Sequence, residues 1–178
     1  MQLLGREGLR ALTHSRVDAE AGLPRGSTSN SFRTRAALLD GVVTWVAERE
    51  LAAFTGRSAA GKDHDLSVEG FARDYCGMIN ALTREHRTQT LARYVLFLEG
   101  AAKPELRRPL LANRHRFEGW MEQMLTLLGA PDPVAAARAV MACGEGLILH
   151  RLTVDPEVAI DQPVFAVVRA VVSSSPAD

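Results

Sequence analysis

Apolar side chains recur every three or four residues along most of the chain, which is the spacing of one face of an α-helix. The pattern predicts helices over about residues 34–55, 66–84, 88–100, 104–128 and 134–152. Three of these helices have a residue suited to a helix start. Asp65 or Ser67 can begin the helix 66–84, Pro104 the helix 104–128, and Asp132 the helix 134–152. The intervening residues 56–67 are rich in Gly, Ser, Lys and Asp and are predicted to form a loop. The chain is therefore expected to be all-α.

The segment over about residues 162–172 is open to two interpretations. Valines dominate it, which is typical of a strand. A single strand would have no partner in an otherwise helical chain, so we predict a helix with apolar side chains on two faces. Residues 134–152 are likewise apolar around much of their circumference. This surplus of apolar surface on the last two helices is most simply buried by a second copy of the chain.

Residues 12–32 follow a different pattern, in which a glycine separates two short helices. Thr13 can cap the first helix, and Val17 would lie on its buried side. Gly22 can adopt the left-handed conformation that ends the helix, and Leu23 would fill the space between the two helices as an apolar plug. The arrangement predicts a helix-turn-helix.

The second helix of this motif, over about residues 25–30, differs from the first, over about residues 14–21. It has almost no apolar side chain to bury and many hydrogen-bonding groups: Arg25, Gly26, Ser27, Thr28, Ser29 and Asn30. Such a helix needs a polar partner, and in helix-turn-helix proteins the second helix enters the major groove of DNA. Phe32 follows as an apolar anchor for the turn into the next helix.

Charge is unevenly distributed along the chain, although the net charge is zero. Residues 1–35 contain six arginines and three acidic residues, a net charge of +3, and the remainder carries −3. A basic N-terminal segment joined to an acidic body suits a protein that meets phosphate groups at one end.

The sequence lacks the spacings that metal sites and helical enzymes require. The histidines are scattered and there is no HExxH, ExxH or CxxC motif, so we expect no metal, no cofactor and no enzymatic activity. Cys143 and His150 would lie two turns apart on one helix, roughly 10 Å along its axis, too far for a nucleophile and its base. A small helical enzyme is therefore the weakest alternative. With two cysteines, no apolar run of membrane-spanning length and no recognisable secretory signal, a cytoplasmic protein is expected.

The order of residues in the first quarter of the chain resembles the TetR family of bacterial transcriptional regulators. The matching residues are Leu12-Thr13, Val17, Ala21-Gly22-Leu23, Gly26-Ser27, Phe32, Arg35 and Leu38-Leu39. The resemblance implies a three-helix, helix-turn-helix head over residues 1–45 and a helical ligand-binding and dimerisation body over residues 46–178. It also implies a function, that of a homodimeric, nucleoid-associated repressor that binds a palindromic double-stranded DNA operator and is released by a small-molecule effector.

Two features depart from the family pattern. Ser29 stands where most members have a tyrosine in the recognition helix, and the first helix is shorter than is usual in the family. Both features would weaken contacts with DNA. The alternative hypothesis is therefore a dimeric, all-helical small-molecule-binding protein that has lost DNA binding.

The resemblance places the DNA contacts on the second short helix and its flanks. Arg25 is the best candidate for reading a base, because a guanidinium can form two hydrogen bonds with a guanine edge. Residues outside the second helix are expected to meet phosphates, which fixes position rather than sequence. The full set of predicted contacts is Thr13, His14, Arg16, Arg25, Gly26, Ser27, Thr28, Ser29, Asn30, Arg33, Thr34 and Arg35.

The body contains candidates for two further sites. Aromatic and methionine side chains on successive helices are predicted to line a cavity for a small, largely apolar ligand: Tyr75, Met78, Tyr94, Phe97, Trp120, Met124 and Met141. The dimer interface is predicted on the last two helices, at Val140, Gly144, Leu147, Ile148, Arg151, Phe165, Val168 and Val172.

Overall fold

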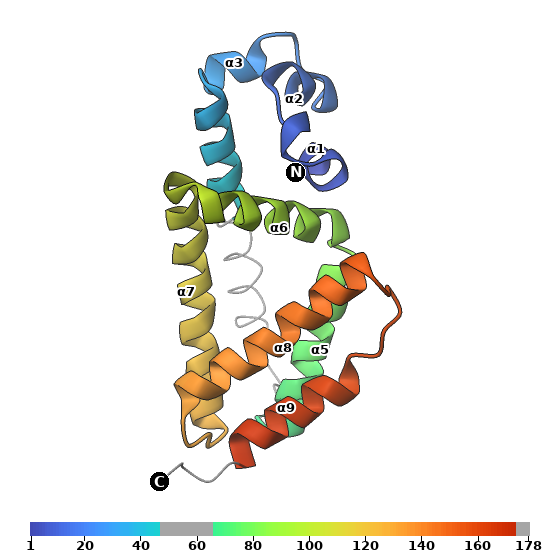
Figure 1. Cartoon of the computed structure of the whole chain (residues 1–178), viewed down its shortest axis with the longest axis vertical. Helices are drawn as coiled ribbons and strands as arrows, with labels where there is room; N and C mark the ends of the chain where they lie inside the picture. The colour runs from blue at the N-terminus through green and yellow to red at the C-terminus, as the bar shows by residue number, and fades with distance from the viewer. Residues whose placement is uncertain (47–65, 174–178) are drawn as a thin grey trace. The chain divides into compact units, whose positions relative to one another are not determined.

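The computed structural model describes residues 1–46 and 66–173 (Figure 1). Every regular element in these two ranges is helical, so the prediction of an all-α fold is confirmed. The elements are α1 (Gln2–Glu7), the 3-10 helix η1 (Leu9–Ala11), α2 (His14–Glu20), α3 (Ser27–Ser31), a helix over residues 35–46, α5 (Val68–Thr83), α6 (Arg87–Ala102), α7 (Pro104–Leu127), α8 (Pro133–Thr153) and α9 (Asp161–Ser173). The end of the predicted helix 34–55 and most of the predicted loop 56–67 lie outside the described residues.

Two of the predicted helix starts are made by the expected side chains. The Ser67 hydroxyl accepts a hydrogen bond from the Gly70 amide at 3.0 Å, at the start of α5. The Asp132 carboxylate accepts one from the Ala135 amide at 2.9 Å, at the start of α8. Pro133 follows in the first turn, where its missing N–H has no helical partner to lose. These signals act locally, and for that reason the sequence alone reveals them.

The segment that was open to two interpretations is a helix, α9. Ile160, directly before the helix, and Val164 and Val168 within it are four residues apart, and each is at most 1 % exposed. The helix packs against both α5 and α8. A spacing of four places these side chains on one face of a helix, whereas the β-propensity of valine is a weak preference that packing overrides.

The chain divides into two compact units, one formed by Met1–Ala60 with Thr88–Arg114 and the other by Gly61–Arg87 with His115–Asp178. The first unit therefore includes most of α6 and the start of α7 as well as the N-terminal helices. A domain boundary at residues 45/46, as the sequence predicts, leaves these later segments out. Periodicity identifies each helix, but it carries no information about which distant helix completes its core.

The core of the first unit draws side chains from both of its segments: Leu4, Leu12, Leu38, Leu39, Val43, Val46, Ala92, Leu96 and Leu110. α1 lies so close to α6 that a Cβ added to Gly5 would be 2.1 Å from the carbonyl oxygen of Thr88. Phe32 packs against the same core, and a Cβ added to Gly41 would be 2.4 Å from its ring. Phe32 is thus the anchor that the sequence predicts.

The second unit is built around α5, against which α8 and α9 pack (Figure 1). α8 approaches α5 closely at Gly144, where an added Cβ would be 2.1 Å from the hydroxyl oxygen of Tyr75. That hydroxyl donates a hydrogen bond to the Val140 carbonyl oxygen at 3.2 Å. A glycine at position 144 is therefore needed for this approach.

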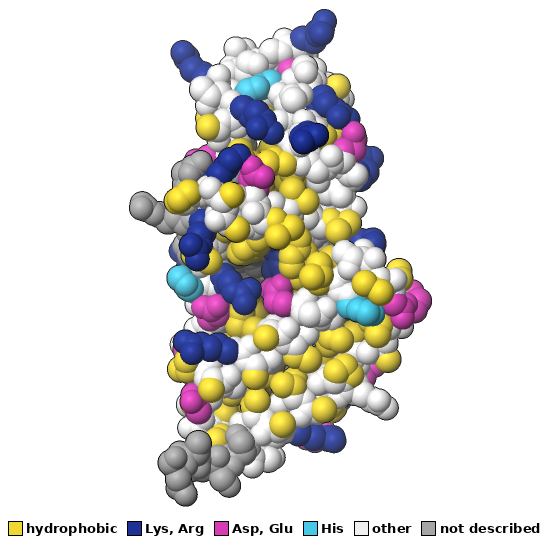
Figure 2. Space-filling view, viewed as in Figure 1, with side chains coloured by type: hydrophobic (Ala, Val, Ile, Leu, Met, Phe, Trp, Pro, Cys, Tyr) yellow, Lys and Arg dark blue, Asp and Glu magenta, His cyan; other side chains and the backbone are white. Residues whose placement is uncertain are grey.

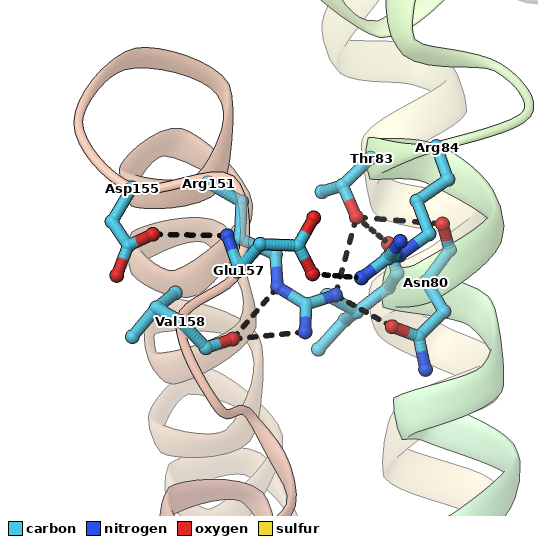
Figure 3. Close-up of polar contacts among 8 residues, drawn as sticks. Asn80, Thr83, Arg84, Arg151, Asp155, Glu157 and Val158 are labelled. Carbon is cyan, nitrogen blue, oxygen red and sulfur yellow. Dashed lines mark hydrogen bonds and ion pairs between the residues drawn. The ribbon is translucent and has the colours of Figure 1, made fainter.

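Arg151, near the end of α8, is 5 % exposed and joins three parts of the second unit. Its guanidinium donates to the Val158 carbonyl oxygen from Nε at 3.0 Å and from Nη2 at 2.9 Å. Nη1 donates to Asn80 Oδ1 and Thr83 Oγ1 on α5 (Figure 3). The sequence predicts Arg151 at the dimer interface, and the structure corrects this. Its donors are used within the unit, where they hold α5 and the segment before α9 to α8.

We predict that Arg151→Met lowers the free energy of unfolding of the second unit by about 2 kcal/mol, because methionine leaves the Val158 carbonyl and the Asn80 side chain without donors. Urea denaturation followed by circular dichroism measures this loss. Arg138→Met is the matched control, since Arg138 is exposed on α8 and forms no hydrogen bond or ion pair with a described residue. Equal stability of the two variants would contradict the role given to Arg151.

Candidate nucleic-acid interface

α2 and α3 are connected by a turn at Gly22. This residue has a left-handed φ of 64°, and the Leu23 amide donates to the Asp18 carbonyl oxygen at 2.8 Å. The predicted helix end at Gly22 is therefore confirmed. Leu23 itself is 49 % exposed, so the prediction of an apolar plug is wrong. Polar groups of α2 and α3 meet between the two helices instead.

The starts of both helices differ in detail from the prediction. Thr13 stands at the N-cap position of α2, but its side chain accepts no capping hydrogen bond and lies 3.5 Å from the Ser15 hydroxyl. α3 begins at Ser27, later than the predicted Arg25, because Gly26 before it is left-handed with a φ of 93°. α3 is consequently a helix of five residues.

Asp18 is the polar group that joins α2 to α3. Its side chain is buried, and Oδ2 accepts a hydrogen bond from the Gly26 amide at 2.8 Å. Oδ1 accepts one from the Thr28 amide at 2.8 Å and another from the Thr28 hydroxyl. The bonds from Thr28 are the main reason that the pKa of Asp18 lies below its usual value. Sequence reasoning missed this role; the available signal was an acidic residue in a helix whose partner helix offers no apolar side chain.

His14 holds the other end of α3. Its Nε2 lies 2.6 Å from the carbonyl oxygen of Phe32, and since a carbonyl oxygen can accept but not donate, Nε2 is the donor. His14 and Asp18 are four residues apart and thus lie on one face of α2. The side chain that the sequence predicts as a phosphate contact is used within the protein.

Four of the predicted DNA contacts are exposed on α3 or directly beside it: Arg25, Ser29, Asn30 and Arg33. Neither arginine makes a hydrogen bond or ion pair with another residue that the structure describes. Both guanidinium groups can therefore bind a phosphate or a base without first breaking a contact inside the protein.

Two other predicted arginine contacts have partners. Arg16 forms an ion pair with Glu7 at 2.6 Å, and Arg35 donates to the Leu9 carbonyl oxygen at 3.1 Å. Both side chains are exposed, so they can exchange these partners for phosphate oxygens. Surface ion pairs of this kind are worth little, about 0–1 kcal/mol.

The remaining predicted contacts serve the fold of the motif. Thr28 is buried against Asp18, and the Gly26 amide donates to the same carboxylate. The Ser27 hydroxyl donates to the Pro24 carbonyl oxygen at 2.7 Å. Thr34 caps the helix over residues 35–46 by accepting a hydrogen bond at 3.0 Å from an amide in its first turn. These groups shape the motif, and the burial of Thr28 removes its side chain from any contact with DNA.

The predicted ligand-lining residues are divided between the two units. Tyr94 and Phe97 belong to the first unit, and the other five, Tyr75, Met78, Trp120, Met124 and Met141, belong to the second. In the second unit, the ring of Phe71 lies 6.2 Å from that of Tyr75 and 6.4 Å from that of Trp120, measured between ring centres. Phe117 lies 5.8 Å from Trp120. The structure thus adds Phe71 and Phe117 to an aromatic cluster that contains two of the predicted residues.

The predicted dimer residues fall into two groups. Five are buried within the second unit: Val140, Gly144, Ile148, Arg151 and Val168. Three are partly exposed: Leu147, Phe165 and Val172. The buried five cannot reach a second copy, and this part of the prediction is corrected. α8 is apolar on several faces, so its sequence does not reveal which face turns toward α5.

The cysteines have the properties of core thiols. Burial raises the pKa of the Cys76 thiol to about 12 and also raises the pKa of Cys143, so both remain protonated at neutral pH. In residues 1–46 and 66–173, no three His, Cys, Asp or Glu side chains are grouped so that they could hold a metal ion. None of the helices in those ranges has the length and apolar character needed to cross a bilayer.

We predict that Asp18→Asn destabilises the protein at pH 7 and that the difference from wild type shrinks in acid. The folded state lowers the pKa of Asp18, so its stabilising effect is fully present above the unfolded value of about 3.9 and is lost as the pH falls through the lower folded value. Urea denaturation at pH 7, at about pH 5 and below about pH 4 measures the difference. The exposed Asp40→Asn is the control. A difference that stayed constant down to the lowest pH would contradict the prediction.

Comparison with known proteins identifies a family and a similar solved structure. Residues 66–174, more than half of the chain, match the family model described as the tetracyclin repressor-like, C-terminal domain. The solved structure of a candidate transcriptional regulator from Streptomyces coelicolor A3(2) superposes with a TM-score of 0.65 and 22 % sequence identity, covering 97 % of this chain and 92 % of that chain. This second similarity indicates a common fold. No curated protein matches the chain.

Proposed function

The chain belongs to the tetracycline repressor-like (TetR) family of transcriptional regulators, which is not a family of enzymes, and we propose that it is a homodimeric repressor. In this proposal two copies bind a palindromic DNA operator through their helix-turn-helix motifs. A small molecule bound in the body favours the state that cannot span the operator, and so releases the DNA.

The polar exposed side of α3 carries the DNA-binding part of the proposal. Thr28 faces inward against Asp18, and Ser29 and Asn30 face solvent. Arg25 and Arg33 flank them on both sides of the helix in the sequence. Neither arginine has a partner in the described residues. This arrangement, with short polar side chains between two arginines, suits contact with the edge of a base that lies between two phosphates.

The outward faces of α8 and α9 support a dimer. Hydrophobic side chains are spread along both helices on the face shown in Figure 2. The exposed residues on this pair of helices include Ala142, Gly146, Leu149, Ala166 and Ala170. Small residues let two copies pack their helices closely, and Leu149, which is 48 % exposed, would gain the most from being covered. We propose these outward positions as the interface, together with the partly exposed Leu147, Phe165 and Val172.

The aromatic cluster of the second unit supports the proposed ligand site. Phe71, Tyr75, Phe117 and Trp120 come from α5 and α7, and Met124 lies one turn beyond Trp120. Aromatic rings and methionines are typical linings for apolar ligands. We propose that the effector is small and largely apolar.

A second function is favoured by Ser29, which lacks the ring found at this position in most TetR proteins. A dimeric ligand-binding protein without DNA binding would need no such ring. The DNA-selection experiment below separates the two functions.

We predict that the purified protein enriches a palindromic duplex from a random pool, and that Arg25→Ala weakens binding to this duplex about 5- to 100-fold. The loss is expected because two hydrogen bonds to a base edge would be removed. Fluorescence anisotropy at fixed salt measures the affinities, and Arg138→Ala in α8 controls for the loss of one positive charge. Failure of the wild type to enrich any palindrome would leave the ligand-binding protein as the better account.

We predict that Leu149→Glu converts the dimer into monomers, because the interface would have to bury a carboxylate without a partner. Sedimentation velocity at micromolar concentration measures the change. Leu127→Glu at the end of α7 is the matched control, since Leu127 is 67 % exposed and lies outside the proposed interface. An unchanged dimer for Leu149→Glu would rule out this face of α8.

A further inference from the structure

The start of α3 has no capping side chain in its own sequence. Gly26 occupies the N-cap position, and a glycine has no side-chain oxygen. A helix of five residues makes very few internal hydrogen bonds, and its first amides need acceptors from elsewhere. The Ser27 amide donates to the Pro24 carbonyl oxygen at 3.1 Å, and the carboxylate of Asp18 reaches the amides of Gly26 and Thr28 from α2.

Hydrophobic packing cannot orient α3 by itself. Its residues are Ser27, Thr28, Ser29, Asn30 and Ser31, none of which has an apolar side chain of any size. Burial of apolar surface is in any case non-directional, whereas hydrogen bonds to a carboxylate are directional and comparatively strong. The orientation of this helix therefore depends on its polar contacts with α2.

We propose that Asp18 is the positioning residue for DNA recognition, setting the rotation of α3 about its axis by binding the amide and the hydroxyl of Thr28. This inference rests on the proposed DNA-binding function. Successive residues of a helix point about 100° apart. When Thr28 is held inward, Ser29 and Asn30 are turned outward, as their exposure shows.

The second contact from α2 fixes the helix along its length. His14 binds the Phe32 carbonyl oxygen just beyond the end of α3, and Asp18 binds the Gly26 amide just before its start. Because both side chains come from one face of α2, α3 is held at both ends by a single neighbouring helix. Asp18 contributes more of this hold, because it accepts three hydrogen bonds and His14 makes one.

The burial of Asp18 distinguishes a positioning role from simple electrostatic repulsion between its carboxylate and the DNA phosphates. Its side chain is 2 % exposed, so it cannot contact DNA directly. Any acidic residue near the DNA repels phosphates, and its removal raises affinity for all sequences alike. A positioning role predicts a different result, in which specific binding falls and general binding is kept.

The experiment compares the full-length wild type with Asp18→Asn, Thr28→Val and Asp40→Asn, at a temperature where circular dichroism shows each to be folded. The probes are the duplex that the wild type enriches from a random pool and a scrambled duplex of the same length. We expect Asp18→Asn to lower the ratio of the two affinities at least about tenfold and to change binding to the scrambled duplex by no more than about threefold. Thr28→Val should lower the ratio less, and Asp40→Asn, which removes the same charge from an exposed position, should leave it unchanged.

Amide hydrogen exchange in the DNA-free protein provides a second readout. The Gly26 and Thr28 amides are expected to be protected in the wild type and to lose protection in Asp18→Asn, with the amides of α5 unaffected. If the wild type enriches no duplex, the proposed function fails and this inference fails with it. If the wild type enriches a duplex but Asp18→Asn keeps its affinity ratio, or keeps the protection of both amides, the inference alone fails.

Discussion

The first amides of a five-residue helix need acceptors that the helix itself does not contain. In this chain the Ser27 amide uses the Pro24 carbonyl oxygen and the Thr28 amide uses the carboxylate of Asp18, the contact that we propose sets the exposed side of α3. With the Thr28 side chain drawn inward, the polar residues of α3 that remain exposed are the ones available to the proposed operator DNA. A buried carboxylate is costly unless its hydrogen-bonding capacity is met, and the hydrogen bonds from Gly26 and Thr28 meet it.

In the second unit, too, a buried charged side chain joins helices through hydrogen bonds, but here the side chain is a positively charged arginine. Arg151 is buried and donates to Val158, Asn80 and Thr83, while Arg87 donates to the Leu152 carbonyl oxygen at 2.8 Å, near the end of α8. Both arginines act on α8, whose apolar faces could pack against α5 in more than one way. Directional hydrogen bonds select one of these packings, which burial of apolar surface alone would not do.

The distribution of surface types agrees with a regulator that has two kinds of partner. In the first unit, exposed arginines and short polar side chains surround α3. In the second, small and apolar residues are exposed on α8 and α9. A polar surface of this kind fits DNA, and an apolar one of this kind fits another protein subunit. The proposed homodimeric repressor would use both surfaces.

The sequence by itself determined the helices, the helix stop at Gly22, the caps at Ser67 and Asp132, and the family resemblance, because each depends on residues close together in the chain. It did not determine the inward side of α8, the burial of Thr28 and Arg151, or the exposure of Leu23. Each of these depends on which side chain of a distant helix lies opposite. Asp18 shows the difference most clearly: from the sequence it is one of three acidic residues in a basic segment, and in the tertiary structure it accepts three hydrogen bonds from Gly26 and Thr28 at the start of α3.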